Sequence, residues 1–226
     1  NIINKYKPKE GSLVVDVGSN DGTLLNFFKQ NNLKVLGVDP AKEIAEKATS
    51  KGIKTLAEFM NLELSAKIKS EYGLAQIVTA NNAFAHMDDL IEMLKSIRTL
   101  MLPDGIFVFE VSYLLDVIQK VLLGTIFHEH HSYHSLKPLI KFMKRYDMEI
   151  IDVERVTIQG GSLIGTAQLI GGPHKISSSV DKLIKLEEKY KLDNTETLSV
   201  FSSRMQKLKN KLRSMLANYK KQGKTI

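Results

Sequence analysis

The chain contains no cysteine, and its longest apolar runs are short for a protein of 226 residues. Without cysteine there is no disulfide, no thiolate nucleophile and no cysteine-ligated zinc site. The apolar runs fall well below the roughly 18 residues that a membrane-spanning helix needs. The first residues also lack the apolar segment of a secretory signal. We therefore expect a globular protein of the cytoplasm that does not enter a membrane.

The formal net charge of +7 is unevenly distributed along the chain. Residues 180–226 carry 12 Lys and Arg against 5 Asp and Glu, whereas residues 1–179 carry 20 of each sign. Within this basic tail, apolar residues recur at helical spacing over 195–221, and acids are mixed among the bases. The pattern favours an amphipathic helix that packs on a neighbour over a surface for nucleic acid. A homo-oligomer formed through these C-terminal helices is one such arrangement.

The most informative stretch is residues 13–22, in which an apolar run leads into a turn that holds two glycines. A helical pattern follows at once, and strand, turn and helix in this order present backbone N–H groups to a ligand. Gly18 permits a positive φ and leaves room for a ligand against the backbone. The spacing matches neither the G-x-G-x-x-G of a dinucleotide site nor the G-x-x-x-x-G-K-[ST] of a phosphate loop. A ligand without a pyrophosphate fits this turn better.

Strand and helix patterns alternate over the first half of the chain. Short apolar runs predict strands, and apolar residues at 3.6-residue periodicity predict helices between them. Such alternation is typical of an α/β protein with a doubly wound, mostly parallel, Rossmann-like sheet. We expect the strands at 12–17, 34–38, 53–55, 75–80 and 106–111, and the helices at 23–31, 41–50, 59–71 and 88–102.

The second half predicts two more strands and a helical end. After helices at 113–123 and 135–146, strands at 148–157 and 163–170 flank the sequence QGGS as in a hairpin. Gly171, Gly172 and Pro173 then interrupt the pattern. Helices at 177–190 and 195–221 follow. We therefore expect a ligand-binding domain over 1–172 and a basic helical extension over 173–226.

Polar residues gather at the expected carboxyl ends of four strands. In an open parallel sheet this edge holds the ligand crevice, so the coincidence predicts one binding site. Asp39 follows the second strand alone, where a carboxylate can accept both hydroxyls of a ribose. The alternative is that Asp39 caps the next helix. The other polar residues at these ends include Asp16, Ser19, Asn20, Asp21, Asn81, Asn82, His86 and Glu110.

Two pairs among these residues suggest specific roles. Asp16 and Asp21 are candidates to hold a ligand ammonium, or else to order the loop between them. Asn82 and His86 stand four residues apart, so one helical turn would bring both to the crevice. Taken alone, such a pair is more often a local cap, and its position past the fourth strand is what makes it a site candidate.

Residues 128–134 have the sequence HEHHSYH. The zinc-protease pattern H-E-x-x-H fails because Ser132 stands in place of the second histidine. His130 and His134 have no obvious third ligand, so we expect no metal. An imidazole beside the carboxylate of Glu129 suits a general base instead, because a His pKa near ~6.5 allows proton uptake at neutral pH. A hydrogen-bonded loop without chemistry is the alternative.

Six motifs, in this order and spacing, resemble one family: VDVGSNDGTLL, VLGVDPA, ANNAFAHMDDL, LPDGIFVFEV, TIFHEHHSY and QGGSL. The family is that of the S-adenosylmethionine-dependent sugar C-methyltransferases, which act on nucleotide-linked 4-keto-deoxyhexoses. The resemblance covers residues 11–168. It implies a class I methyltransferase fold, with S-adenosyl-L-methionine as cofactor and a nucleotide-linked sugar as substrate.

The resemblance also implies which residues bind the cofactor. The turn residues would line its methionine end, and Asp39 would hold its ribose. Together with the other residues at the strand ends, the candidate cofactor site is Asp16, Gly18, Ser19, Asn20, Asp21, Asp39 and Asn81.

The candidate catalytic residues follow from the same resemblance. Asn82 and His86 match an Asn and a His near the reacting sugar. Glu129 and His130 match the Glu and His of the H-E-H segment, in which the His is the proposed base. That base would remove the proton from C3 of the sugar, beside the C4 ketone, and the resulting enolate would accept the methyl group. Polar donors that hold the developing oxyanion would assist this step.

The chain departs from the family pattern at several points. Phe127 stands where the family commonly has Tyr, and Gln159 where it often has His. Family members usually begin with a Cys-rich zinc module and continue into a second Rossmann-like half. We therefore expect either a piece of a longer protein or a relative with another substrate. Two alternatives stay open: an O- or N-methyltransferase acting on another small metabolite, and a non-catalytic module that binds S-adenosylmethionine.

Overall fold

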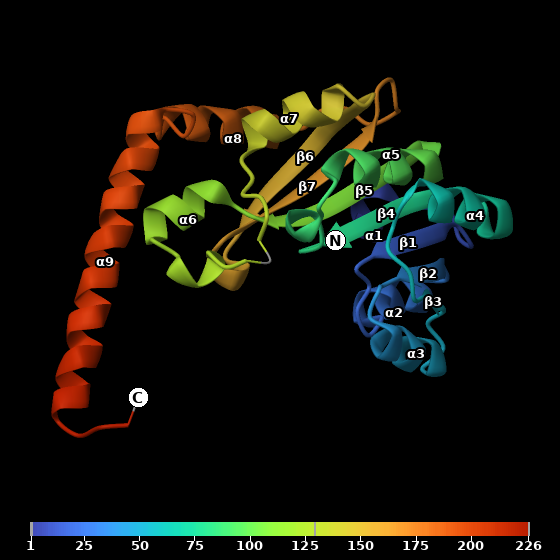
Figure 1. The fold of residues 1–226 in the computed structure, drawn as a ribbon. Coiled ribbons are helices and arrows are strands. Elements are labelled where there is room, and N and C mark those ends of the chain that lie inside the picture. The colour runs from blue at the N-terminus through green and yellow to red at the C-terminus, as the bar shows by residue number, and fades with distance from the viewer. Residues whose placement is uncertain (1, 129, 226) are drawn as a thin grey trace.

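The computed structural model describes residues 2–128 and 130–225, and its centre is a seven-stranded sheet (Figure 1). The strand order is β3-β2-β1-β4-β5-β7-β6. Neighbouring strands are parallel except where β7 pairs with β5 and β6. The expected mostly parallel sheet is thus confirmed. The strands are β1 (Leu13–Val17), β2 (Lys34–Val38), β3 (Thr55–Leu56), β4 (Ala75–Asn81), β5 (Met101–Ser112), β6 (Met148–Val156) and β7 (Ser162–Leu169).

Helices cover both faces of the sheet. Side chains of α4, α5, α7 and α8 join the larger core on one face, and those of α1 and α2 join the smaller core on the other. The helices are α1 (Ile2–Tyr6), α2 (Thr23–Gln30), α3 (Lys42–Ser50), α4 (Leu62–Tyr72), α5 (Leu90–Leu100), α6 (Leu114–Lys120), α7 (Leu136–Lys144), α8 (Ser178–Lys189) and α9 (Thr195–Lys221), with single 3-10 turns at Phe84–His86, Leu123–Thr125 and Ile158–Gly160.

The strand β5 shows why the apolar runs of this sequence become central strands. Phe107, Phe109 and Val111 enter the larger core, whereas Ile106 and Val108 enter the smaller one. Successive side chains of a strand point to opposite faces, so a continuous apolar run fits a strand that is buried on both sides. This arrangement places the carboxyl ends of β1, β2, β4 and β5 along one edge of the sheet.

Two helix starts show the effect of capping residues. Asp89 caps α5, because its carboxylate accepts the backbone N–H groups of Ile91 and Glu92. The helix expected at 59–71 instead begins at Leu62, because the side chain of Asn61 accepts the N–H of Leu64 at 2.8 Å and fixes the start there. The segment that contains Phe59 therefore stays in the loop after β3.

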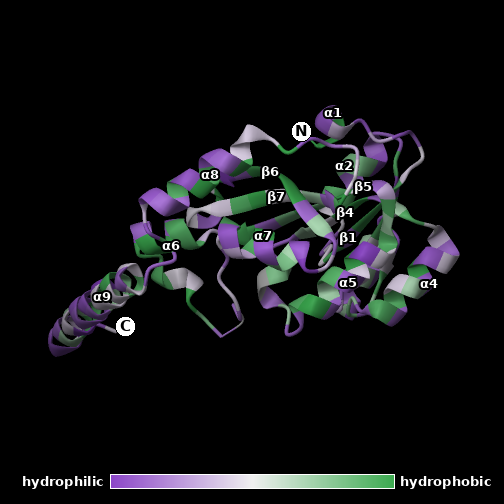
Figure 2. Cartoon of the chain, turned by 90° about the horizontal axis from the view of Figure 1, so that it is seen from above, coloured by the Kyte–Doolittle hydropathy of each residue, from purple (hydrophilic) through white to green (hydrophobic). Residues whose placement is uncertain are grey.

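The two C-terminal helices differ in how they pack. α8 lies on β6 and buries Val180 and Leu183 in the larger core. α9 extends away from the sheet, and none of its residues is buried (Figures 1 and 2). Among the described residues, no helix combines the length and the apolar character needed to cross a membrane.

Candidate functional site

Two cavities adjoin at the carboxyl edge of the sheet and share one wall. The first cavity, of 430 Å³, lies over the ends of β1, β2 and β4. The second cavity, of 590 Å³, lies beyond the end of β5 and is lined in part by His130 and Gln159. Asn82 and His86 line both cavities, so a ligand in one can lie next to a ligand in the other. Both volumes fall within the about 300–1,000 Å³ of small-molecule sites.

The glycine turn after β1 forms the floor of the first cavity. Gly18 has φ 74°, and its N–H donates to the carbonyl of Val38 at 2.8 Å. A Cβ atom on Gly18 would lie 3.0 Å from the Cβ of Ala83, which leaves no space for a side chain. The positive φ and the close approach of the β4 loop together explain why glycine occupies this position.

Asp39 holds the loop after β2, and its side chain does not cap α3, whose N-cap residue is Ala41. Its Oδ2 accepts the N–H of Asn20 at 2.9 Å, and its Oδ1 accepts the N–H of Ala41 at 2.9 Å, just ahead of α3. A carboxylate has about four acceptor positions, so both oxygens keep capacity for ligand hydroxyls. Asp39 and Asn20 both line the first cavity, so a carboxylate that organises the loop also borders the space for a ligand.

Asp16 lies beneath the site inside the sheet and is only 3% exposed. Its Oδ1 accepts the hydroxyl proton of Thr79, on the neighbouring β4, at 2.5 Å. Burial raises the pKa of Asp16 to about 7, against the smaller effect of that hydrogen bond, and the charge of Asp39 raises it further. The pKa of a carboxyl group so placed falls when a cation approaches, because the positive charge favours the carboxylate.

Ser19 and Asp21 are predicted ligands that do not line the first cavity. The side chain of Ser19 packs against β2, where a Cβ atom on Gly37 would lie 2.4 Å from its Oγ. Asp21 accepts the N–H and the hydroxyl of Thr23 at 3.1 Å and 2.6 Å, and these bonds lower its pKa. Ser19 thus packs the turn against the sheet, and Asp21 stabilises the first turn of α2.

The shared wall brings together residues that the sequence predicted to act together. Asn82 has a left-handed backbone with φ 52°, and its N–H donates to the carbonyl of Glu110 at 2.9 Å. This turn is followed by the short helix at Phe84–His86, which brings His86 back to the wall. The ring of His86 lies 4.7 Å from the ring of His130, centroid to centroid. Asn81, one residue earlier, also lines the first cavity.

One hydrogen bond to the backbone sets the tautomer of His130. Its Nδ1 lies 2.9 Å from the carbonyl oxygen of Thr125, which can only accept, so Nδ1 carries the proton. The neutral ring then has its lone pair on Nε2. Phe127 lies against the ring with centroids 4.3 Å apart. Glu129, the predicted partner of this base, lies outside the described residues.

The other histidines of this segment have different surroundings. His134 is buried beside Phe84, its Nε2 is 2.9 Å from the hydroxyl of Ser132, and burial lowers its pKa to about 4. His131 forms an exposed pair with Asp88 at 3.0 Å. No group of three potential metal ligands occurs among the residues that the structure describes. His134 is therefore a neutral, structural side chain at physiological pH.

Several residues of the two cavities were not predicted from the sequence. Phe59 and Met60 line the first cavity from the loop after β3, and Thr125 lines the second. The cap at Asn61 is the signal that could have kept Phe59 and Met60 out of a helix. Thr125 acts through its backbone carbonyl, so no pattern of residue types indicates its role.

Comparison with known proteins identifies families for both parts of the chain. The family described as a methyltransferase domain matches residues 2–153, and one described as a C-methyltransferase C-terminal domain matches residues 157–226. C-methyltransferase NovU of Streptomyces niveus is 32% identical over 217 residues, which are 96% of this chain and 52% of NovU. The chain thus spans about half the length of this curated relative.

Two further comparisons concern a more distant relative and the fold. Ubiquinone biosynthesis O-methyltransferase of Colwellia psychrerythraea is 24% identical over 182 residues, which are 74% of this chain and 70% of that protein. The structure of magnesium protoporphyrin IX methyltransferase from Synechocystis, with bound SAH, is similar with a TM-score of 0.57 at 16% identity. That similarity covers 73% of this chain and 77% of the other.

These matches confirm the class I methyltransferase fold and support S-adenosylmethionine, the cofactor expected from the sequence. The chain belongs to the methyltransferase-domain family, and its C-terminal part matches the C-terminal domain of C-methyltransferases.

Proposed function

We propose that this chain binds S-adenosylmethionine in the first cavity and directs methyl transfer to C3 of a nucleotide-linked 4-keto-deoxy sugar in the second. The observation that supports this most is the shared wall of Asn82 and His86, with the ring of His130 4.7 Å from that of His86. Both ligands of a methyl transfer must meet at one place, and the two cavities adjoin where the candidate base lies.

The charge of the first cavity fits this cofactor. Asp39, Glu58 and Asp88 line it, and no Lys or Arg is among its described lining residues. S-adenosylmethionine carries a sulfonium, an ammonium and one carboxylate, so its net charge is positive and complementary to these acids. A pyrophosphate would be repelled in the same place. Asp39 would accept the ribose hydroxyls, and Asn20 and Asn81 would lie beside the rest of the ligand.

His130 is the residue that we assign as the general base. The ketone of the acceptor acidifies the hydrogen on the adjacent carbon, and the Nε2 lone pair of His130 can accept that proton. The carbonyl of Thr125 holds Nδ1–H during this transfer and stabilises the imidazolium that results. Asn82 and His86 can donate hydrogen bonds to the oxygen on which negative charge develops. When bound, the cofactor supplies the electrophilic methyl group.

The choice of carbon as the methyl acceptor rests on the relatives. NovU, which is named a C-methyltransferase, is similar along almost all of this chain. Because the chain spans only 52% of NovU, the sugar acceptor and the complete activity remain part of this proposal. We further propose a cytoplasmic enzyme that self-associates through α9.

The test is methyl transfer by the wild-type chain and by His130→Asn, with a radiolabelled methyl donor and a panel of nucleotide-linked keto sugars. Loss of a general base lowers turnover by about 10²–10⁴-fold. We expect such a loss in His130→Asn and an unchanged dissociation constant for the cofactor. The matched control is His131→Asn, because His131 is adjacent and its ion pair is exposed.

The same assay separates the alternatives. Full turnover in His130→Asn would show that another residue is the base. Transfer to a hydroxyl or amine of a metabolite mixture, with no transfer to keto sugars, would identify an O- or N-methyltransferase. Tight cofactor binding without transfer to any acceptor would indicate a module that binds the cofactor without catalysis.

A further inference from the structure

The turn at Ile158–Gly160, between β6 and β7, brings one side chain to the second cavity. Gln159 lines that cavity together with His86 and His130, and its backbone is left-handed with φ 51° and ψ 30°. A non-glycine residue in this conformation is held there by its surroundings. The turn joins β6 to β7, so its position relative to the cavity is set by contacts outside the hairpin itself.

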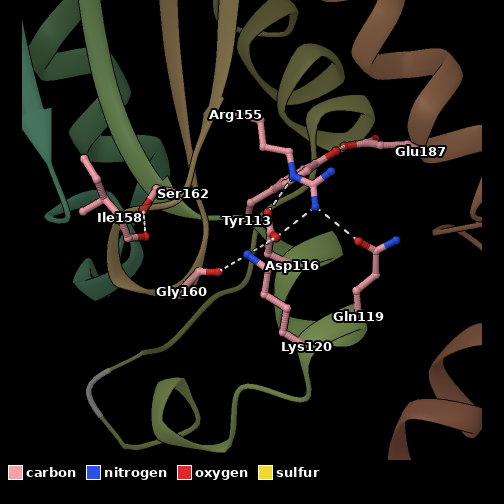
Figure 3. Close-up of polar contacts among 9 residues, drawn as sticks. All are labelled: Tyr113, Asp116, Gln119, Lys120, Arg155, Ile158, Gly160, Ser162 and Glu187. Atoms are coloured by element: carbon pink, nitrogen blue, oxygen red, sulfur yellow. Dashed lines mark hydrogen bonds and ion pairs between the residues drawn. The ribbon is translucent and has the colours of Figure 1, made fainter.

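Backbone hydrogen bonds fix the turn on both sides of Gln159. The carbonyl of Ile158 accepts the N–H of Gly161 at 2.9 Å and the hydroxyl of Ser162 at 3.3 Å. The carbonyl of Gly161 accepts the N–H of Tyr113 at 3.1 Å. Lys120, on α6, donates from Nζ to the carbonyl of Gly160 (Figure 3). The turn is therefore attached to the start and to the end of α6.

The two glycines let the turn lie directly on α6. A Cβ atom on Gly161 would lie 2.3 Å from the Cβ of Asp116, and one on Gly160 would lie 2.8 Å from a methyl carbon of Leu122. Gly160 also has φ 91°, which favours glycine. A side chain at Gly161 would collide with Asp116, so this glycine lets the turn lie against α6.

An ion-pair cluster around the buried carboxylate of Asp116 joins α6 to β6 beside the turn (Figure 3). Arg155, on β6, donates from Nε and Nη2 to the two oxygens of Asp116 at 2.8 Å and 2.9 Å. Lys120 binds Asp116 Oδ1 at 2.7 Å, so one cation bridges the carboxylate and the turn. The Asp116 side chain is only 1% exposed. Two cations therefore compensate one buried carboxylate, and Arg155 still pairs with it when Lys120 is replaced.

We propose that the Asp116–Arg155–Lys120 cluster fixes the turn so that the amide of Gln159 binds a polar group of the methyl acceptor in the second cavity. Gln159 is then a specificity-determining residue, and Lys120 is a positioning residue that acts through it. An amide both donates and accepts hydrogen bonds, so it suits an acceptor that presents hydroxyl or carbonyl groups. This assignment depends on the proposed function in one respect, which is that the methyl acceptor binds in the second cavity.

The first experiment measures the turn itself, without turnover. Amide hydrogen exchange is followed in peptides that cover 157–163 for the wild type, Lys120→Met and Gln119→Ala. Lys120→Met is used because Lys120 is 43% exposed and Arg155 still pairs with both oxygens of Asp116. Gln119 is the matched control, since it accepts from Arg155 at 3.2 Å but does not hold the turn. We expect several-fold faster exchange at 157–163 only in Lys120→Met, with β1 unchanged. Equal exchange in all three proteins would overturn the proposal.

The second experiment is a double-mutant cycle on the Michaelis constant for the acceptor. Loss of one hydrogen bond predicts an increase of several-fold to about tenfold in KM for Gln159→Ala, with the cofactor dissociation constant unchanged. Lys120→Met should raise KM in the wild-type background and have no effect in Gln159→Ala, because it acts through Gln159. Lys120→Arg should restore KM in part. Additive effects of Lys120→Met and Gln159→Ala, or an unchanged KM in Gln159→Ala, would contradict the inference.

The two proposals fail in different ways. The cycle uses any acceptor that the wild type methylates, so a different acceptor or a different base would overturn the proposed function alone. If no acceptor is methylated, the exchange of residues 157–163 still decides whether Lys120 fixes the turn.

Discussion

At the scale of single residues, the charge of Asp16 depends on its place inside the sheet. Burial raises the pKa of Asp16 to about 7 from an ordinary value of 3.8. Between these two values the folded chain keeps a proton that the unfolded chain has lost. The free energy of unfolding therefore falls as the pH rises through this window, by about 4 kcal/mol for three pH units.

Asp16→Asn should remove this loss of stability. The unfolding free energy of Asp16→Asn should not fall in this way. Between pH 4 and pH 7 it should therefore rise by about 4 kcal/mol relative to that of the wild type. His134 changes the wild-type curve in the opposite sense, because burial lowers its pKa to about 4. Urea denaturation of both proteins at each pH isolates the contribution of Asp16. A difference that stays constant with pH would contradict the assigned burial effect.

Individual site residues could be predicted from the sequence only where the backbone fixes their direction. Asp39 and Asn82 line the cavities as expected, because each directly follows a strand whose end points at the crevice, and the short helix at Phe84–His86 returns His86 to the same wall. Ser19 and Asp21 lie in the same turn as Gly18, yet they contact Gly37 and Thr23. A left-handed turn does not alternate its side chains as a strand does, so periodicity gives no direction there.

At the scale of elements, Glu187 joins three parts of the fold. From α8 it accepts the N–H groups of Leu136 and Lys137, at 2.6 Å and 3.1 Å, at the start of α7. It also accepts the hydroxyl of Tyr113 at 3.0 Å, just before α6. Glu187 is 1% exposed, and this charge is compensated by donors at a helix N-terminus.

Glu187→Ala should destabilise the chain by about 3 kcal/mol, because it leaves two helix N–H groups and a buried hydroxyl without an acceptor. Its neighbour Glu188 provides the control, since that side chain is 56% exposed and only 3.7 Å from Lys137. Glu188→Ala should change the unfolding free energy by less than about 1 kcal/mol. Thermal and urea unfolding measure both variants. Equal effects of the two substitutions would show that the buried contacts of Glu187 add nothing.

Most elements could be predicted from periodicity, and the differences arise where local hydrogen bonds override it. The range of α9 agrees with the prediction because its apolar stripe and its cap at Asn194 coincide. α4 starts three residues later than expected because Asn61 supplies a cap within an apolar pattern. α1 was not predicted, since five residues are too few to show a helical period. Its apolar side chains gain their order by packing against the smaller core.

At the scale of the whole molecule, α9 carries an exposed apolar stripe on a strongly basic helix. Leu208 and Leu212 are 37% and 38% exposed on a helix that buries none of its residues. The same helix carries seven Lys and Arg but one Glu. An exposed apolar stripe favours association, whereas like charges on two copies of the helix oppose it.

Self-association through α9 should therefore strengthen with salt. We expect sedimentation velocity to show a larger share of dimers at 0.5 M than at 0.05 M NaCl, because salt screens the repulsion and leaves the apolar contact. Leu208→Lys with Leu212→Lys should remove the association at both salt concentrations. Dimers that dissociate as salt is added would instead indicate an interface made by ion pairs.

The hydrogen bond between His130 and the carbonyl of Thr125 has a consequence for repeated turnover. A peptide carbonyl is uncharged, so through that contact a protonated ring would be oriented without an ion pair. On the proposed role of His130 as the base, the proton that it takes up would pass to water that enters the second cavity after the product leaves. That release would return the ring to its starting form for the next turnover.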